Sequence, residues 1–131
     1  MTGSVLIIDA HSFPDQPLAM DLDQLTPRPD GCIGTADVHT PPALVNAARA
    51  WCRERSWNLG IDKPYAGTIV PLKHYLRSKN VWSIMIEINR SRYMDLGDGQ
   101  PIRNDRFEDT RDFVRGLILR VREVASESTV K

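Results

Sequence analysis

The chain has 131 residues, which fits one domain with enough length to bury about two-thirds of its unfolded surface. Its 17 acidic and 17 basic residues leave no formal net charge, so nothing electrostatic favours nucleic acid or an anionic membrane as a partner. The longest apolar runs are four or five residues, too short to cross a bilayer, and no signal-peptide pattern opens the chain. We therefore expect a single cytoplasmic domain over residues 1–131, with no nucleic-acid or membrane partner.

The first predicted element is a buried parallel strand over residues 5–8, which runs directly into Asp9 and His11. In open α/β sheets, functional groups gather where such strands end. In an extended segment these two residues share a face, so Asp9 can orient the imidazole as carboxylates do for metal-bound histidines. The alternative is that Asp9 caps a turn and His11 is a solvated loop residue.

The middle of the chain predicts one helix among loops and short strands. Residues 13–30 hold four prolines and four aspartates and are expected to form a long loop. Thr40, as the N-cap before two prolines, starts an amphipathic helix that ends near Arg55. Residues 32–35 and 57–61 are predicted strands, and residues 68–72 are a further extended candidate. Cys32 and Cys52 lack metal or redox spacing and are expected to be buried, reduced thiols.

The last third predicts the central strand and a long helix. Residues 81–89 are apolar enough to be buried on both faces. Asp105 and Glu108 resemble a capping box that starts the helix, and residues 126–131 form a polar, flexible tail. Strands alternating with helices predict an α/β layered domain, with a mostly parallel or mixed sheet of four to five strands flanked by helices.

Glu87 is the residue that core packing does not explain, because it lies between Ile86 and Ile88. Burying a charged carboxylate costs several kcal/mol, so Glu87 should be paired, protonated or exposed at the end of the strand. Desolvation would raise its pKa, which suits a general base that activates water. The alternative is a structural ion pair with Arg90 or Lys79.

Polar residues after this strand are candidates for substrate binding. Arg90 can clamp a carboxylate, and Tyr93 can donate to a developing oxyanion. The alternative is that they are loop residues making salt bridges, which we prefer for Arg92. His39 is either a ligand or proton donor, or a cap on neighbouring backbone.

Four short blocks carry these candidates: IDAHSFP at 8–14, CIGTADVHTP at 32–41, PYAG at 64–67 and IMIEINRSRYM at 84–94. In this order they resemble the N-formylglutamate amidohydrolases, over roughly residues 5–95. The most specific part is the spacing Glu87-x-Asn89-Arg90-x-x-Tyr93-Met94. That family is similar to the zinc carboxypeptidases, and its members hydrolyse the formyl amide of a formylated amino acid with a metal-activated water.

The resemblance implies a role for each matched residue. His11 matches a zinc ligand with Asp9 behind it, and Glu87 matches the base. Near the substrate it implies Arg90, Tyr93, Asn89 and His39. A catalytic zinc needs about three protein ligands, and this chain supplies one convincingly.

Two departures from the family pattern limit what the resemblance implies. Family members are about twice as long, and their other metal ligands precede the equivalent of Val5. Asp62 also stands where the family usually has asparagine. The chain therefore resembles the carboxyl-terminal half of an amidohydrolase, with an incomplete zinc site.

We first expect a truncated hydrolase-like domain that is not competent alone. One alternative is an active metal-dependent amidohydrolase whose site is completed by another subunit. Its substrates would be N-acyl amino acids, which are small amides that bear a carboxylate. The other is a non-catalytic module for binding a small carboxylate or for association. Each version predicts a homo-oligomer, most simply a dimer, because a missing half uncovers apolar surface or a strand edge.

Overall fold

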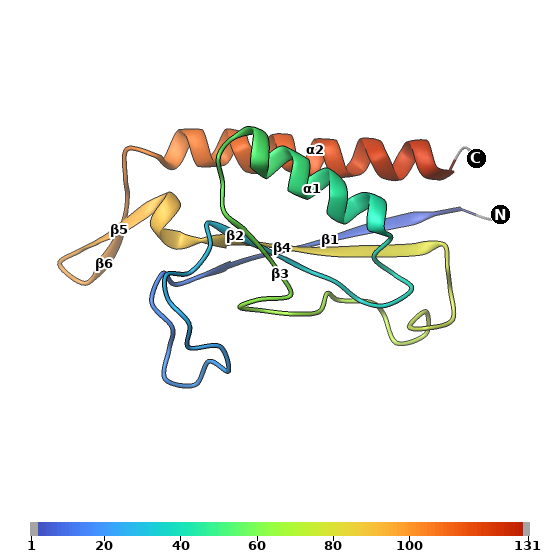
Figure 1. The fold of residues 1–131 in the computed structure, drawn as a ribbon, viewed down its shortest axis with the longest axis horizontal. Helices are drawn as coiled ribbons and strands as arrows, with labels where there is room; N and C mark the ends of the chain where they lie inside the picture. Colours follow the sequence, from blue (N-terminus) through green and yellow to red (C-terminus); the bar gives the residue numbers. More distant parts are fainter. Residues whose placement is uncertain (1–2, 130–131) are drawn as a thin grey trace.

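A computed structural model describes residues 3–129 and places a four-stranded mixed sheet at the centre of the fold (Figure 1). Its strands lie in the order β1-β4-β2-β3. β4 is parallel to β1 and antiparallel to β2, while β2 is parallel to β3. The layered α/β prediction is confirmed. The strand bounds are Val5–Phe13 for β1, Gly31–Gly34 for β2, Leu59–Ile61 for β3 and Val81–Asn89 for β4.

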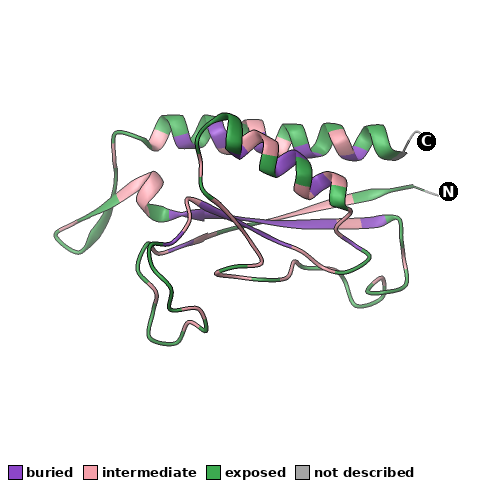
Figure 2. Ribbon diagram, in the orientation of Figure 1, coloured by how far each residue is buried: buried purple, intermediate pink, exposed green. Residues whose placement is uncertain are grey.

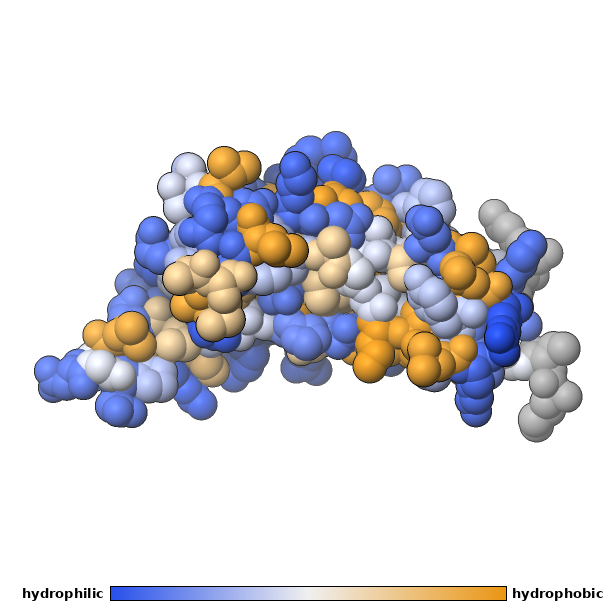
Figure 3. All heavy atoms as spheres, turned by 90° about the horizontal axis from the view of Figure 1, so that it is seen from below, coloured by the Kyte–Doolittle hydropathy of each residue, from blue (hydrophilic) through white to orange (hydrophobic). Residues whose placement is uncertain are grey.

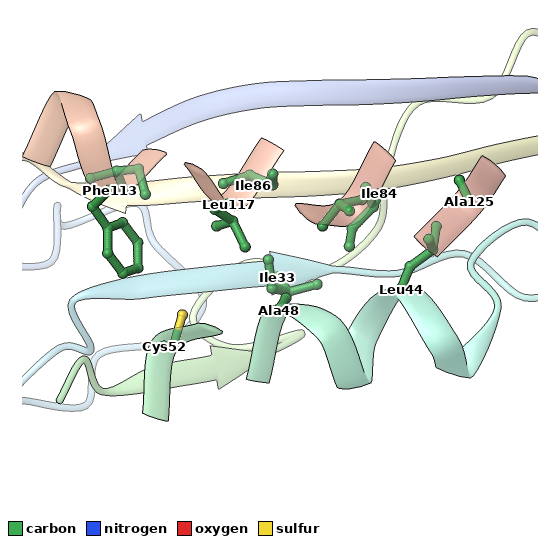
Figure 4. Packing of buried hydrophobic residues seen from close by; sticks show 11 residues of the cluster. Ile33, Leu44, Ala48, Cys52, Ile84, Ile86, Phe113, Leu117 and Ala125 are labelled. Atoms are coloured by element: carbon green, nitrogen blue, oxygen red, sulfur yellow. The ribbon is translucent and has the colours of Figure 1, made fainter. Parts of the chain in front are cut away.

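Both long helices, α1 (Pro42–Glu54) and α2 (Phe107–Thr129), cover the same face of this sheet (Figure 1). The core fills the space between them and the strands (Figure 4). Its buried members include Ile33, Leu44, Ile84, Ile86 and Leu117. The opposite face carries the connecting segments 14–30 and 62–80 and no helix (Figure 1). Seen from that side, apolar side chains form several separate groups among polar ones (Figure 3).

β4 occupies an interior position, and its predicted bounds are correct. Nearly all of it is buried (Figure 2). Since successive side chains of a strand alternate between faces, Ile84, Ile86 and Ile88 in the core place the odd-numbered residues on the helix-free face. Glu87 and Asn89 therefore point away from the helices.

β1 differs from its prediction in length and burial. It continues through Asp9 and His11 to Phe13, so the two polar residues lie within the strand. Among the described residues its neighbour is β4 alone, which makes β1 an edge strand. The expectation of a buried strand is therefore wrong: residues 6–9 are half-buried, and Val5, Ala10 and His11 are exposed.

The helix ends also differ from the sequence prediction. Pro41 is the N-cap of α1, and the Thr40 hydroxyl instead donates to the Ser83 carbonyl (2.7 Å). At the start of α2, the Asn104 side chain accepts from the Arg106 N–H (3.0 Å), so the capping box predicted from Asp105 and Glu108 does not form there. α2 continues to Thr129, into the predicted tail, of which residues 130 and 131 lie outside the described range.

Residues 90–103 contain elements that were not predicted. A 3-10 turn, η1 (Arg90–Arg92), leads into a hairpin of β5 (Met94–Gly97) and β6 (Gln100–Arg103). Asp98 and Gly99 form its two-residue turn, both with positive φ. This Asp-Gly pair is a known hairpin signal.

The remaining global predictions concern the cysteines and the membrane. Both cysteines are free and buried, as predicted. Burial raises the pKa of Cys52 to about 11 and also raises the pKa of Cys32. No helix within residues 3–129 is long and apolar enough to cross a membrane.

Candidate functional site

The centre of the candidate site is the pairing of His11 with Glu87. The two residues are direct partners in the register of the parallel strands β1 and β4. Directly paired residues of neighbouring strands project from the same face of a sheet, here the face without helices. The structure therefore brings together the two residues to which the sequence assigned metal binding and base catalysis.

Asp9 fixes the orientation of the His11 ring. Its Oδ1 lies 2.7 Å from His11 Nε2, and its Oδ2 accepts the backbone N–H of Ile69 (3.1 Å). Because a carboxylate accepts hydrogen bonds, this contact selects the neutral tautomer in which His11 Nε2 carries the proton and Nδ1 keeps its lone pair. The prediction that Asp9 and His11 share a face and interact is confirmed. The His11 side chain is 51% exposed, so Nδ1 belongs to a ring that solvent reaches.

Glu87 is buried and has an unused acceptor. The residue is 7% exposed, and Oε2 has no hydrogen-bond partner. Burial raises its pKa, nearby His11 lowers it, Asp9 raises it and Arg90 lowers it, with a net rise. The ion pairs found within residues 3–129 do not include Glu87. The alternative prediction, a structural ion pair of Glu87 with Arg90 or Lys79, is therefore wrong for the described residues. A desolvated carboxylate with a free oxygen is suited to take a proton from water.

We expect Glu87→Gln to raise the free energy of unfolding at pH 7 by about 1 kcal/mol, because it removes a buried, unpaired carboxylate. The folded-state pKa of Glu87 lies above its unfolded value. Its contribution to stability is thus complete below the unfolded pKa, near 4.3, and is lost as pH rises through the folded pKa. Denaturant unfolding across pH should show the gain of the variant shrinking toward pH 4.

The exposed Glu127→Gln variant is the control and should change stability little at any pH. A Glu87→Gln variant that is less stable than wild type at pH 7 would contradict this expectation. So would a difference that does not change with pH.

Arg90 bonds to Ser12, the residue after His11, and keeps donors that no described residue uses. Its guanidinium donates from Nε to the Ser12 hydroxyl (3.1 Å) and from one terminal nitrogen to the Ser12 carbonyl (3.2 Å). The ion pairs found within residues 3–129 do not include Arg90. A guanidinium has five N–H groups, so three remain for a carboxylate. Arg92, by contrast, makes the salt bridge that we preferred for it, because its Nη1 lies 3.4 Å from Asp30 Oδ1.

Tyr93 packs toward α2. Its ring meets Phe107 edge-on at 6.3 Å between centroids. A cavity of about 270 Å³ lies between this pair and the end of β1. Its lining comprises His11, Ile88, Tyr93, Phe107, Thr110, Arg111 and Val114. Tyr93 therefore contacts a mostly apolar hollow at the end of the strand that carries His11.

Asn89 has a structural role in the described chain. Its amide nitrogen donates to Asp15 Oδ1 (3.0 Å) and to the Pro29 carbonyl (3.1 Å). Its Oδ1 accepts from the N–H and the hydroxyl of Ser91. All four hydrogen-bonding positions of the amide are used, so Asn89 ties the 14–30 segment and η1 to the end of β4.

His39 lies apart from the other candidates. It is fully buried, with Nδ1 2.8 Å from the Val81 carbonyl and Nε2 accepting from the Leu76 N–H (2.9 Å). Val81 begins β4, about 20 Å from Glu87 at 3.3 Å per strand residue. Both ring nitrogens are occupied, so His39 serves the core here and is not brought to the predicted substrate position.

A buried cluster beside the site was missed from the sequence. The Arg28 guanidinium donates to Asp21 Oδ2 (2.8 Å) and to the Tyr65 hydroxyl (3.1 Å), and it lies over the rings of Tyr65 and Phe13. These contacts hold the 14–30 segment in place. Tyr65 belongs to one of the four sequence blocks, but nothing in the sequence pairs it with a residue 37 positions earlier.

The described residues do not form a complete metal site around His11. Within residues 3–129, no group of three His, Cys, Asp or Glu side chains is placed to hold a metal ion. The residues nevertheless fit part of such a site, because His11 offers Nδ1 as one ligand and the carboxylate of Glu87 lies beside it as a candidate base.

Comparison with known proteins places this geometry in context. The sequence profile of the N-formylglutamate amidohydrolases matches residues 1–94. The crystal structure of N-formylglutamate amidohydrolase from Ralstonia eutropha JMP134 superposes with a TM-score of 0.70 at 24% identity, over 95% of this chain and 44% of that protein. The shared fold thus spans less than half of that protein's length. No match was found among the curated proteins.

Proposed function

Because the chain belongs to the N-formylglutamate amidohydrolase family, we propose that residues 3–129 provide part of a metal-dependent amidohydrolase site and are not competent alone. In this proposal they correspond to the carboxyl-terminal half of such a hydrolase. The observation that carries it is the pairing of His11, oriented by Asp9, with the buried and partly unbonded carboxylate of Glu87.

His11 Nδ1 is the proposed metal-binding atom. A hydrogen bond from the other ring nitrogen to a carboxylate is the usual second partner of a metal-bound histidine, and Asp9 supplies it at 2.7 Å. When bound in a site of this kind, zinc lowers the pKa of its water to about 7 and polarises a carbonyl, as in the zinc carboxypeptidases. Its remaining ligands would come from protein outside residues 3–129.

Glu87 and Arg90 have complementary proposed roles. The Glu87 carboxylate takes a proton from the attacking water and holds it, because burial keeps the pKa of this carboxyl raised. Arg90 binds the carboxylate of an N-acylated amino acid through its three free N–H groups. The proposed substrate class is therefore a small amide that bears a carboxylate.

Arg90 also favours the second candidate function. An exposed guanidinium without an ion-pair partner can bind a small carboxylate with no metal and no turnover. In that case, replacing Arg90 would weaken carboxylate binding, and replacing Glu87 would leave it unchanged.

The metal proposal is tested by zinc titration in a calorimeter. Wild type should bind zinc weakly, His11→Ala should lose this binding, and His74→Ala should keep it. His74 is the matched control because its Nδ1 bonds to Ser78 in a distant loop. Equal binding by wild type and His11→Ala would overturn the metal-binding role.

Turnover of N-formyl-L-glutamate tests competence separately. The described residues alone should show none. Turnover by wild type that Glu87→Gln abolishes would overturn the proposed incompetence and establish a complete site. Turnover that Glu87→Gln does not change would overturn the base role of Glu87.

A further inference from the structure

We propose that Ser83 is a positioning residue for the His11 ring. It acts through the backbone of Ile69, which holds the carboxylate of Asp9. Ser83 lies on β4 and is fully buried, at 0% exposure. As an odd-numbered residue of that strand it projects from the helix-free face. A hydroxyl buried there needs hydrogen-bond partners, and the structure supplies two from the connecting segment 62–80.

The directions of the two hydrogen bonds of the Ser83 hydroxyl can be assigned. Its Oγ lies 2.7 Å from the carbonyl oxygen of Ile69 and 2.7 Å from Thr68 Oγ1. A carbonyl can only accept, so the single hydroxyl proton of Ser83 goes to Ile69, and Thr68 donates to Ser83 Oγ. The bond to Ile69 is therefore the one by which Ser83 fixes the backbone of the segment.

The backbone of Ser83 is itself held on both sides. On one side β1 pairs with β4 at this level, where Ile7 is the partner of Ser83. On the other side, the Ser83 N–H donates to the His39 carbonyl (2.8 Å), and the Ser83 carbonyl accepts the Thr40 hydroxyl (2.7 Å). Ser83 is thus a fixed point from which its hydroxyl reaches the segment that crosses the sheet.

Ile69 carries the constraint from β4 to β1. Its carbonyl accepts from Ser83, and its N–H donates to Asp9 Oδ2 (3.1 Å). Within the described range, the hydrogen bonds found for residues 68–70 go only to Ser83 and Asp9. The Ile69 side chain is 61% exposed there, so apolar packing does not replace these bonds. The position of the Ile69 N–H therefore depends on Ser83.

The two carboxylate oxygens of Asp9 have separate partners. Oδ2 receives the Ile69 N–H, and Oδ1 lies 2.7 Å from His11 Nε2. An aspartate on an edge strand can turn about its side-chain torsions, and the bond from Ile69 holds it in the rotamer that faces the ring. Outer partners of this kind orient metal-bound histidines, and removing them typically costs about 10–100-fold in metal affinity.

This series of contacts from Ser83 to His11 deepens the proposed function and rests on it only for the zinc measurement. The orientation of the ring is a property of the chain without metal, so it is tested without metal. If Ser83 only stabilised the fold, its loss would lower the free energy of unfolding and leave the Asp9 rotamer and the His11 ring unchanged.

NMR at about pH 8.5, where free imidazole is neutral, tests the positioning role directly. Wild type should show a single side-chain rotamer for Asp9 and the Nε2–H tautomer of His11. Ser83→Ala should show Asp9 couplings averaged over several rotamers and a measurable fraction of the Nδ1–H tautomer of His11. Asp9→Ala removes the direct partner of the ring and sets the size of the full effect on the tautomer.

Thr68→Val is the matched control, because it removes one hydrogen bond of Ser83 and keeps the one to Ile69. It should leave the Asp9 rotamer and the His11 tautomer as in wild type. Ser83→Cys keeps a weak donor, so it should give an intermediate effect, and it decides the question if Ser83→Ala does not fold. Unchanged signals in the folded Ser83 variant, or an equal change in Thr68→Val, would overturn the positioning role.

Zinc titration measures the consequence for the proposed site. Ser83→Ala should bind zinc about tenfold more weakly than wild type, and Thr68→Val should bind it equally well. Wild-type affinity in Ser83→Ala would overturn the contribution of Ser83 to metal binding. A wild type that binds no zinc would overturn the metal-binding role of His11, and the rotamer and tautomer would then decide the role of Ser83 alone.

Discussion

Replacing Gly34 with alanine should lower the free energy of unfolding by about 3 kcal/mol or more, one of the largest effects expected for a single methyl group in this chain. Gly34 ends β2 opposite Met85 of β4. A Cβ at this position would overlap the carbonyl oxygen of Gly67 and the Met85 side chain. Because the carbonyl is backbone, no rotamer change relieves the contact, and the strand or the 62–67 turn must move.

Asp62 makes that movement costly. Its carboxylate accepts the N–H (2.8 Å) and the hydroxyl (2.6 Å) of Thr35, next to Gly34. Its Oδ1 also accepts the N–H of Gly67 (3.4 Å). The turn is thereby clamped to the end of β2. Moving it would break these hydrogen bonds.

Chemical denaturation monitored by circular dichroism measures the loss. Gly3→Ala is the control, because a Cβ there meets nothing within 4 Å and should change stability by less than about 0.5 kcal/mol. If Gly34→Ala proved as stable as wild type, the close packing of Gly67 on β2 would be contradicted.

The second large effect is expected for Arg28→Met, which should cost about 2–4 kcal/mol. The Arg28 side chain is 1% exposed, and its terminal nitrogens donate to Asp21, to Tyr65 and to two backbone carbonyls. Methionine keeps much of the apolar length and removes every donor. The carbonyls of Pro14 and Asp23 would then lose their donor, and the carboxylate of Asp21 would keep only the Leu18 N–H and the Tyr65 hydroxyl.

The damage should be greatest in the 14–30 segment. We expect limited proteolysis to cut this segment much faster in the variant, together with the loss in unfolding free energy. Arg120→Met is the matched control, because Arg120 pairs with an exposed Glu123 and should contribute less than about 1 kcal/mol. Unchanged proteolysis of Arg28→Met would show that other contacts hold the segment.

Features set by local sequence could be predicted. The nine apolar-rich residues of β4 gave correct bounds, since a strand buried on both faces needs a continuous apolar run. The shared face of Asp9 and His11 followed from the two-residue period of a strand. The Asp98-Gly99 turn also has a local signal, because an Asp-Gly pair favours the positive φ that a two-residue hairpin turn requires.

Features set by distant contacts could not be predicted. Nothing local specifies that β2 runs antiparallel to β4 or that both helices cover one face. The histidines illustrate this limit. His39 and His11 both follow an aspartate two residues earlier, yet one is a fully bonded core residue and the other is half-exposed beside Glu87. The pairing of β1 with β4, which sets His11 opposite Glu87, is what distinguishes the two histidines, and the local sequence does not specify it.

The most direct test of the proposed half-site is an NMR titration of the histidine ring nitrogens with zinc. The account predicts that zinc shifts His11 Nδ1, while Nε2 keeps its proton to Asp9 and the rings of His39 and His74 are unaffected. His11→Ala should abolish the effect. A titration in which His11 Nδ1 does not respond, or in which His74 responds instead, would contradict the assignment of His11 as a metal ligand.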